Sequence, residues 1–292
     1  MSKTCHSEYG TIESIVIKPV EDAFISENLI ADQWEKLNYL NQPDLKEAVK
    51  EYEAFQSHIK NNSSQLFTLP QNDSVGMDSM YCRDAAIATD FGMIICNMGK
   101  EARTQEPQAE KHFFLANDIP ILGEITAPGT LEGGDVAWID QETLAVGHTY
   151  RTNEEGIRQL KALLEPKGIE VIVARLPHYK GKSDVFHLMS ILSPVDKDLA
   201  VVYSPLMPID FRNLLLDHGY RLVEVPDEEF DSMGCNVLAL SPSKCLMVEG
   251  NPITQQRLQD AGCEVIAYQG EEISVKGGGG PTCLTRPIWR KL

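Results

Sequence analysis

The chain has 292 residues, of which 42% are hydrophobic and 24% charged, and its net charge at pH 7 is −17. This composition is that of a globular protein with a sizeable core in one or two domains. The negative charge disfavours nucleic acids and anionic membranes as partners, because phosphate binding needs clustered lysine and arginine. It suits a cationic small molecule as the ligand.

The start of the chain lacks the apolar segment of a signal peptide, and no apolar run is long enough to cross a membrane. The seven cysteines include no Cys-x-x-Cys pair and resemble neither a disulfide framework nor a zinc site. We therefore expect a reducing, cytoplasmic location. The histidines show no metal-ligand spacing, so we expect neither a metal nor another cofactor.

A hairpin pattern recurs along the chain, with starts about 50 residues apart, a period typical of repeat architectures. Each hairpin consists of two apolar, β-rich stretches around a turn rich in Asp, Ser, Pro or Gly. The predicted hairpins span residues 84–97, 135–147, 187–203 and 236–249. In the third, residues 193–198 are predicted to form the turn.

Each hairpin is followed by a helical pattern and then by a short strand. Residues 153–165 carry apolar side chains at helical spacing, with Asn153 as the N-cap and Gly168 just beyond the end. The other predicted helices and strands are 111–117 with 119–122, 209–218 with 221–225, and 252–261 with 263–268. A divergent fifth unit has strands at 14–17 and 65–69 and a helix at 45–59.

Five ββαβ units with apolar sheet faces must bury those faces against their neighbours. They can do so by closing radially, with sheets inside and helices outside. No Pro/Ser-rich linker divides the chain, so we expect a single α/β domain over residues 1–292. The centre of the ring would form a pocket, into which residues at the heads of the hairpins would point.

Side chains capable of chemistry recur at these heads. They are Asp78, Asp84, Glu132, Asp135, His187 and Cys283. Each also has an ordinary interpretation: acidic residues make turns, histidine and cysteine can fill a core, and the Gly-rich segment 277–280 can be a linker. Glycines also allow close approach to a ligand, and Pro281 stiffens the chain just before the thiol. Recurrence at equivalent positions predicts that these groups converge.

The chain contains four motifs that are informative in combination: LEGGDV at 131–136, YRTNEEG at 150–156, FHLMS at 186–190 and GGGPTCLT at 278–285. In combination they resemble the guanidine-modifying, or pentein, superfamily, and most of all its dimethylarginine dimethylaminohydrolases and arginine deiminases. The EYG at 8–10 is similar to that family's opening. The resemblance covers nearly the whole chain and implies a five-bladed α/β propeller with pseudo-fivefold symmetry.

The resemblance also implies roles for the residues. Cys283 would be the nucleophile, His187 the general acid and base, and Glu132 the carboxylate that orients His187. Asp78 and Asp84 would grip the guanidinium of the substrate.

Further substrate contacts are implied for Arg151, which would hold the α-carboxylate, for Arg103 at a second such position, and for Asp135. The chemistry is consistent with this. Two carboxylates can fix a planar guanidinium while a thiolate attacks its central carbon, and an acid/base residue can protonate the departing amine. The expected intermediate is a thiouronium adduct, and the product is a ureido compound.

Met189 departs from the pattern, because arginine deiminases and amidinotransferases have Asp two residues after the histidine. The dimethylarginine hydrolases also lack that Asp and usually have lysine, so Met189 favours a substituted arginine without matching them fully. Two enzyme alternatives stay open: an arginine deiminase or dihydrolase, and an amidinotransferase.

A non-catalytic binding module is the alternative from another class, since a ribosome-associated initiation factor shares the fold. Such a module would have no reason to keep Cys283 more reactive than the other cysteines. The expected partner is a small guanidine substrate, and the protein could be a monomer or a homo-oligomer. The insert at residues 28–43 could be a lid over the pocket or an ordinary surface helix.

Overall fold

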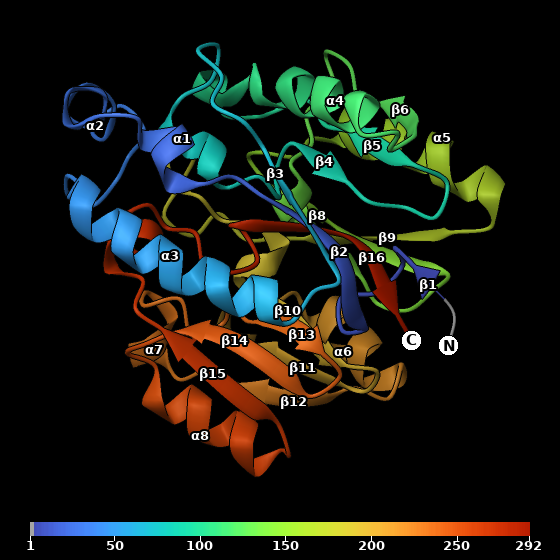
Figure 1. The fold of residues 1–292 in the computed structure, drawn as a ribbon. Coiled ribbons are helices and arrows are strands. Elements are labelled where there is room, and N and C mark those ends of the chain that lie inside the picture. The colour runs from blue at the N-terminus through green and yellow to red at the C-terminus, as the bar shows by residue number, and fades with distance from the viewer. Residues whose placement is uncertain (1–2) are drawn as a thin grey trace.

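The computed structural model describes residues 3–292 and divides them into five small sheets (Figure 1). Four sheets follow one another along the chain: β4 (Ala86–Ile87), β5 (Met93–Ile95) and β6 (Ile121–Glu124); β7 (Val136–Trp138), β8 (Thr143–His148) and β9 (Glu170–Arg175); β10 (Leu192–Asp196), β11 (Leu199–Val202) and β12 (Arg221–Glu224); β13 (Leu238–Ser241), β14 (Lys244–Val248) and β15 (Glu264–Tyr268). In each, the first two strands are antiparallel and the third is parallel to the second. The predicted ββαβ unit is therefore confirmed.

A helix connects the second and third strands of each unit and lies outside the strands (Figure 1). These helices are α3 (Leu45–Asn61), α4 (Glu106–Ala116), α5 (Glu154–Leu164), α6 (Ile209–Asp217) and α8 (Pro252–Asp260). Asn153 caps α5 as predicted, since its side chain accepts a hydrogen bond from the Gly156 amide. Gly168 has a φ of 85°, a left-handed conformation that glycine adopts without strain.

The core explains why the sheets form a ring. In β2 (Thr11–Ile17), Ile15 and Ile17 pack toward the sheet of β13 to β15, while Val16 packs toward the sheet of β4 to β6. The same alternation between two neighbouring sheets occurs in β5, β8, β11 and β14. Because successive side chains of a strand point to opposite faces, each middle strand is buried on both sides. Five apolar clusters therefore join five blades, and the predicted propeller is confirmed.

The first blade is completed by the end of the chain, which sequence reasoning did not predict. Its strand order is β1 (Lys3–Thr4), β16 (Thr285–Lys291), β2 and β3 (Gln65–Thr68). β16 pairs antiparallel with both β1 and β2, so the first and last strands of the chain lie side by side (Figure 1). Cys283 stands two residues before β16.

Two predicted boundaries were wrong. Residues 193–196, expected in a turn, belong to β10, where Pro194 lies opposite Ala200. β10 is an edge strand of its sheet, so the proline removes no ladder hydrogen bond that the sheet requires. The helix predicted at 111–117 begins at Glu106, where Pro107 suits the first turn.

The remaining helices are short: α1 (Val20–Phe24), α2 (Glu27–Gln33) and α7 (Asp227–Phe230). Within residues 3–292, no helix is both long enough and apolar enough to cross a membrane.

Candidate active site

A cavity of about 290 Å³ opens where the heads of the hairpins meet, and each blade contributes to its wall. The contributing residues include Asp84, Gly134, His187, Asn236 and Cys283, one from the start of each hairpin. The predicted residues Asp78, Arg103 and Arg151 also line it. The structure therefore brings the predicted nucleophile, the acid/base residue and the two predicted guanidinium-binding carboxylates to one cavity.

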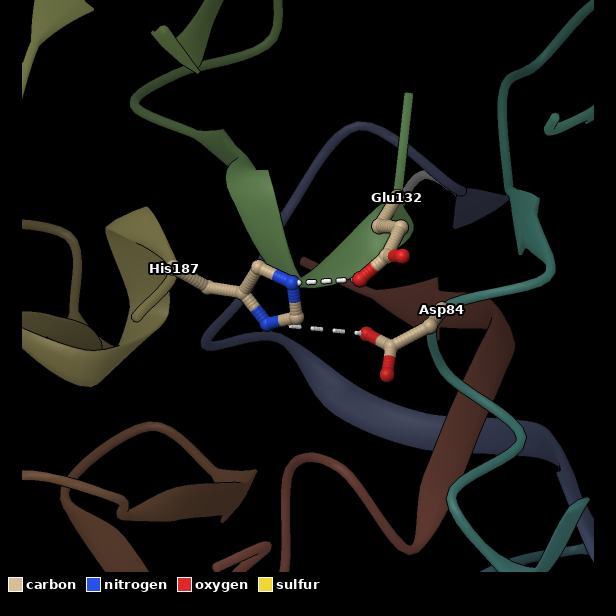
Figure 2. A group of neighbouring side chains, drawn as sticks. All are labelled: Asp84, Glu132 and His187. Atoms are coloured by element: carbon tan, nitrogen blue, oxygen red, sulfur yellow. Dashed lines mark hydrogen bonds and ion pairs between the residues drawn. The ribbon is translucent and has the colours of Figure 1, made fainter. Parts of the chain in front are cut away.

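His187 and Glu132 form a close pair beside this cavity (Figure 2). Nε2 of His187 lies 2.8 Å from Oε2 of Glu132, and Nδ1 lies 3.9 Å from Oδ1 of Asp84. The other oxygen of Glu132 accepts hydrogen bonds of 3.0 Å each from the amides of Gly99 and Lys100. These two amides fix the carboxylate, so that its second oxygen faces the imidazole.

The charges around His187 favour its protonated form. Burial alone would lower the pKa of His187, but the carboxylates of Asp135, Asp84 and Glu132 outweigh it and raise the pKa to about 9. Burial acts against the charged form of Glu132 as well. The hydrogen bond and charge of His187, followed by the charge of Arg151, nevertheless hold the pKa of Glu132 below its usual range. At neutral pH the pair is an imidazolium and a carboxylate, which suits His187 to donate a proton.

The glycine pair of the LEGGDV motif is a packing requirement. A Cβ atom on Gly134 would collide with Nδ1 of His187 and lie 2.7 Å from Oδ1 of Asp84. A Cβ atom on Gly133 would collide with the carbonyl of Arg83 and lie 2.6 Å from Nη2 of Arg286. Only glycine at these positions lets three blades bring their side chains together.

Asp135, predicted to bind substrate, lies beneath His187 and outside the cavity wall. Its carboxylate accepts hydrogen bonds from the Leu188 amide at 3.0 Å and from Oγ1 of Thr149 at 2.7 Å. Burial raises the pKa of Asp135 to about 6, against the opposing charge of His187. In this position it anchors the backbone that carries His187.

Both predicted guanidinium-binding carboxylates already have cationic partners. Oδ2 of Asp84 lies 2.6 Å from Nη1 of Arg103, and Oδ2 of Asp78 lies 2.6 Å from Nζ of Lys100. Arg103 also pairs with Glu106 at 2.8 Å and donates to the Tyr81 carbonyl, so its guanidinium is largely committed to the protein. Lys100 was not singled out in the sequence, because a lysine after a strand is usually a solvated residue.

Arg151 follows β8 and precedes α5. It is 5% exposed and lines the cavity, and Nη1 lies 3.4 Å from both oxygens of Glu132. A guanidinium held loosely by one carboxylate retains donors for an incoming anion. Its position is compatible with the carboxylate-binding role that was predicted for it.

The Gly-rich segment before Cys283 is shaped by neighbouring side chains. Among the four glycines of this segment, only Gly278 has a left-handed backbone, with a φ of 74°. A Cβ atom on Gly277 would collide with Oη of Tyr81, and one on Gly279 would lie 2.5 Å from the Tyr81 ring. The segment therefore needs glycine to pass Tyr81 closely. Gly277, Gly278 and Gly279 also line the cavity, so close approach to a ligand stays a prediction.

The thiol of Cys283 is half-buried and faces the cavity. Burial, followed by the charge of Asp84, raises its pKa, while hydrogen bonds from Asn236 and Thr282 lower it. Asn236 and Thr282 were not assigned a role from the sequence. The pKa of the Cys283 thiol is therefore set by burial and Asp84, which raise it, against the two hydrogen bonds, which lower it.

Asp84, Glu132 and His187 also offer one possible metal ligand each, with the three atoms within 4.8 Å of one another. Two of these groups are paired with arginine, Asp84 with Arg103 and Glu132 with Arg151. Those guanidinium charges compete with a cation, so the geometry fits an acid/base pair better than a metal site.

The insert at residues 28–43 contributes to the cavity. Leu37, Asn38 and Leu40 line it, and Leu40 is 68% exposed. Nζ of Lys100 donates to the Leu37 carbonyl at 2.7 Å, and the Leu40 amide donates to the Lys276 carbonyl at 2.8 Å. The insert is thus a wall of the site, and its movement as a lid stays a prediction.

Comparison with solved structures identifies the class of fold. A mutant of the dimethylarginine dimethylaminohydrolase (DDAH) from Pseudomonas aeruginosa, in complex with citrulline, superposes with a TM-score of 0.76 at 23% identity. The match covers 94% of this chain and 98% of that one. The chain thus has the fold of the pentein superfamily, as its motifs implied.

Sequence comparison identifies the family. The family model for eukaryotic N,N dimethylarginine dimethylhydrolase matches residues 22–290, and the chain belongs to this family. It is 30% identical over 208 residues to the N(G),N(G)-dimethylarginine dimethylaminohydrolase of Streptomyces coelicolor, covering 71% of this chain and 73% of the relative. It is 29% identical over 252 residues to the arginine deiminase of Mycoplasma capricolum, covering 73% of this chain and 61% of that enzyme. The protein is a hydrolase acting on carbon–nitrogen bonds of linear amidines.

Proposed function

We propose that the protein hydrolyses the guanidine carbon–nitrogen bond of arginine or an N-substituted arginine, giving a ureido product and an amine or ammonia. The observation that carries this proposal is that the Cys283 thiol and the His187 imidazole line one cavity together with Asp84. Family membership supports the reaction, and the relatives named for dimethylarginine support the substrate class.

In the proposed first step, the thiolate of Cys283 attacks the central guanidinium carbon. The tetrahedral adduct collapses as protonated His187 transfers its proton to the departing nitrogen, which leaves as an amine or as ammonia. A thiouronium remains on Cys283. The proximity of His187 to two carboxylates supports its role as the acid, because they keep it protonated at neutral pH.

In the second step, neutral His187 removes a proton from water, and the resulting hydroxide attacks the thiouronium carbon. The carbon–sulfur bond then breaks, which regenerates the Cys283 thiolate, and the hydroxyl proton passes to solvent as the neutral ureido product is released. Glu132 stabilises the imidazolium that forms again.

Binding of the substrate rests on charge. The carboxylates of Asp78 and Asp84 face the cavity and can accept hydrogen bonds from a guanidinium. Lys100 and Arg103, which now contact one oxygen of each, would hold the two carboxylates in place. Arg151 is the cation we assign to the substrate's α-carboxylate, since a planar guanidinium binds carboxylate with two parallel hydrogen bonds.

Met189 supports an N-substituted substrate. It is 3% exposed, lines the cavity and packs in the same apolar cluster as Phe186 and Leu188. A thioether offers no strong hydrogen-bond acceptor to an unsubstituted guanidinium nitrogen, but it packs well against N-alkyl groups. Free arginine is the runner-up substrate, which would make the enzyme an arginine deiminase or dihydrolase, and an amine acceptor in place of water would make it an amidinotransferase.

The test is to incubate the protein with arginine, N-methylated arginines and agmatine, and to measure ureido products, amines and ammonia. Cys283→Ser should fold normally and lose turnover. Cys235→Ser is the matched control, because Cys235 lies at the same cavity with its sulfur 3.8 Å from the Val201 carbonyl, and it should retain activity. Near-native turnover by Cys283→Ser would overturn the assignment of the nucleophile.

All seven cysteines are free thiols, which is compatible with the cytoplasmic location that we propose.

A further inference from the structure

Asn236 lies at the same distance from a strand of its blade as two of the candidate active-site residues. It stands two residues before β13, as Asp84 stands two before β4 and Cys283 two before β16. Its side chain is 6% exposed and lines the cavity. A buried amide in this place must have its donors and acceptor satisfied by specific partners.

The contacts of Asn236 determine which way its amide points. Oδ1 accepts a hydrogen bond of 3.0 Å from the Thr282 amide and one of 2.8 Å from Oγ1 of Thr282. A backbone amide can only donate, so the oxygen of Asn236 must face Thr282. The NH₂ group consequently faces Cys283, and Nδ2 lies 3.3 Å from Sγ.

The Gly-rich segment is built to allow this contact. A Cβ atom on Gly280 would lie 2.6 Å from both Cγ and Oδ1 of Asn236, and one on Gly279 would lie 3.1 Å from Cβ of Cys283. Any larger residue at position 280 would push Asn236 away from the segment that carries the thiol. The amide and the nucleophile are therefore packed as one unit.

We propose that Asn236 is a positioning residue that holds Cys283 in its attacking orientation and stabilises the thiolate by donating an amide hydrogen to the sulfur. The inference rests on the proposed function, in which Cys283 is the nucleophile. Within residues 3–292, the side chains that hydrogen-bond Sγ are those of Asn236 and, at 3.9 Å, Thr282. Of the two, the amide of Asn236 makes the shorter contact, and it points an N–H at the sulfur.

The alternative is that Asn236 only fastens the loop through Thr282. Asn236→Asp separates the two roles, because a carboxylate has the same shape and can still accept both hydrogen bonds from Thr282. Its second oxygen would then face the sulfur in place of the NH₂ group. The loop contacts persist in this variant, while the donor to the thiolate is replaced by a negative charge.

The experiment measures the rate of Cys283 alkylation by iodoacetamide against pH, with the modified residue identified by mass spectrometry. A hydrogen bond to a charged group corresponds to a shift of about one to two pKa units. We expect the midpoint of alkylation to rise by about that amount in Asn236→Ala and by at least as much in Asn236→Asp. At pH 7, kcat/KM should fall about 10- to 100-fold, with a smaller change in KM. Asn117→Asp, which adds the same charge at the exposed end of α4, should change neither quantity.

Circular dichroism and thermal melting of each variant establish that it is folded. If the alkylation midpoint of folded Asn236→Asp equals that of the wild type, the amide does not act on the thiolate and the inference is overturned. Alkylation requires no substrate, so this result is independent of the activity assay. Retained turnover by Cys283→Ser would overturn the proposed function instead.

Discussion

Glu132→Gln tests whether the His187–Glu132 pair sets the protonation state of the acid/base residue. The amides of Gly99 and Lys100 hold Oε1 of Glu132, so a glutamine would place its carbonyl oxygen there and turn its NH₂ group toward Nε2 of His187. Two donors would then face each other whenever His187 is protonated at Nε2. The variant should therefore favour the neutral imidazole.

The size of the effect follows from the contact. A hydrogen bond between buried charged groups contributes about 1.5–3 kcal/mol, and one pKa unit corresponds to about 1.4 kcal/mol. The pKa of His187, about 9 in the wild type, should fall by about one to two units. It should stay above the ordinary histidine value, because the charges of Asp135 and Asp84, which are the two largest single contributions that raise it, remain in the variant.

The assay is an NMR titration of the His187 ring, assigned by comparison with His187→Gln, together with kcat/KM against pH. In Glu132→Gln the alkaline limb that belongs to His187 should move to lower pH by the same amount. Glu110→Gln is the matched control: Glu110 is buried on α4, and burial raises its pKa well above the usual range, so that the substitution removes little charge. An unchanged His187 midpoint in Glu132→Gln would refute the reasoning.

The remaining predictions concern stability, recognition and packing. The pKa of His187 is raised from 6.5 to about 9, so its contribution to the free energy of unfolding, about 3 kcal/mol, is present below pH 6.5 and lost as pH rises through 9. Denaturant unfolding of the wild type and of His187→Gln at pH 6 and pH 9.5 measures this contribution. An equal loss of unfolding free energy between the two pH values in both proteins would contradict the prediction. Arg151→Ala should raise KM more than it lowers kcat for amino-acid substrates and leave agmatine almost unaffected, whereas an equal penalty on both would assign Arg151 a structural role. Met189→Asp should raise the ratio of kcat/KM for free arginine to kcat/KM for N-methylated arginine by on the order of tenfold. If this ratio does not change, or if the wild type strongly prefers free arginine, an arginine deiminase or dihydrolase becomes the better proposal. Gly134→Ala should reduce kcat/KM by at least about 100-fold while the fold is kept, because a displacement of about 1 Å at the reacting groups costs that much; full activity would show that His187 and Asp84 can move apart freely.

Much of the fold could be predicted because each blade is encoded locally. The alternation of Ile15, Val16 and Ile17, the N-cap at Asn153 and the left-handed Gly168 are each visible within a few residues of sequence. The closure of the first blade by β16 could not be read in this way. It joins segments more than 260 residues apart, and the residues of a closing strand look like those of any other short strand.

The candidate site was predictable to the extent that the repeats align its residues. His187 and Cys283 were noticed because their chemistry is unusual at the head of a hairpin. Asn236 occupies an equivalent position, but an asparagine before a strand is more often part of a turn. Lys100 lies after a strand and meets Asp78 only in three dimensions. Roles that depend on partners from another blade need the structure.

The closure of the ring by β16 also governs when the enzyme can become reactive. Cys283 lies on the segment that leads directly into this strand, and Asn236 and Tyr81, which surround it, come from two other blades. Without β16 paired to β2, Cys283 would lie on an undocked segment, away from His187. Docking of Cys283, the proposed nucleophile, therefore depends on the same pairing of β16 that completes the propeller, so a chain without β16 in place would hold no working catalytic centre.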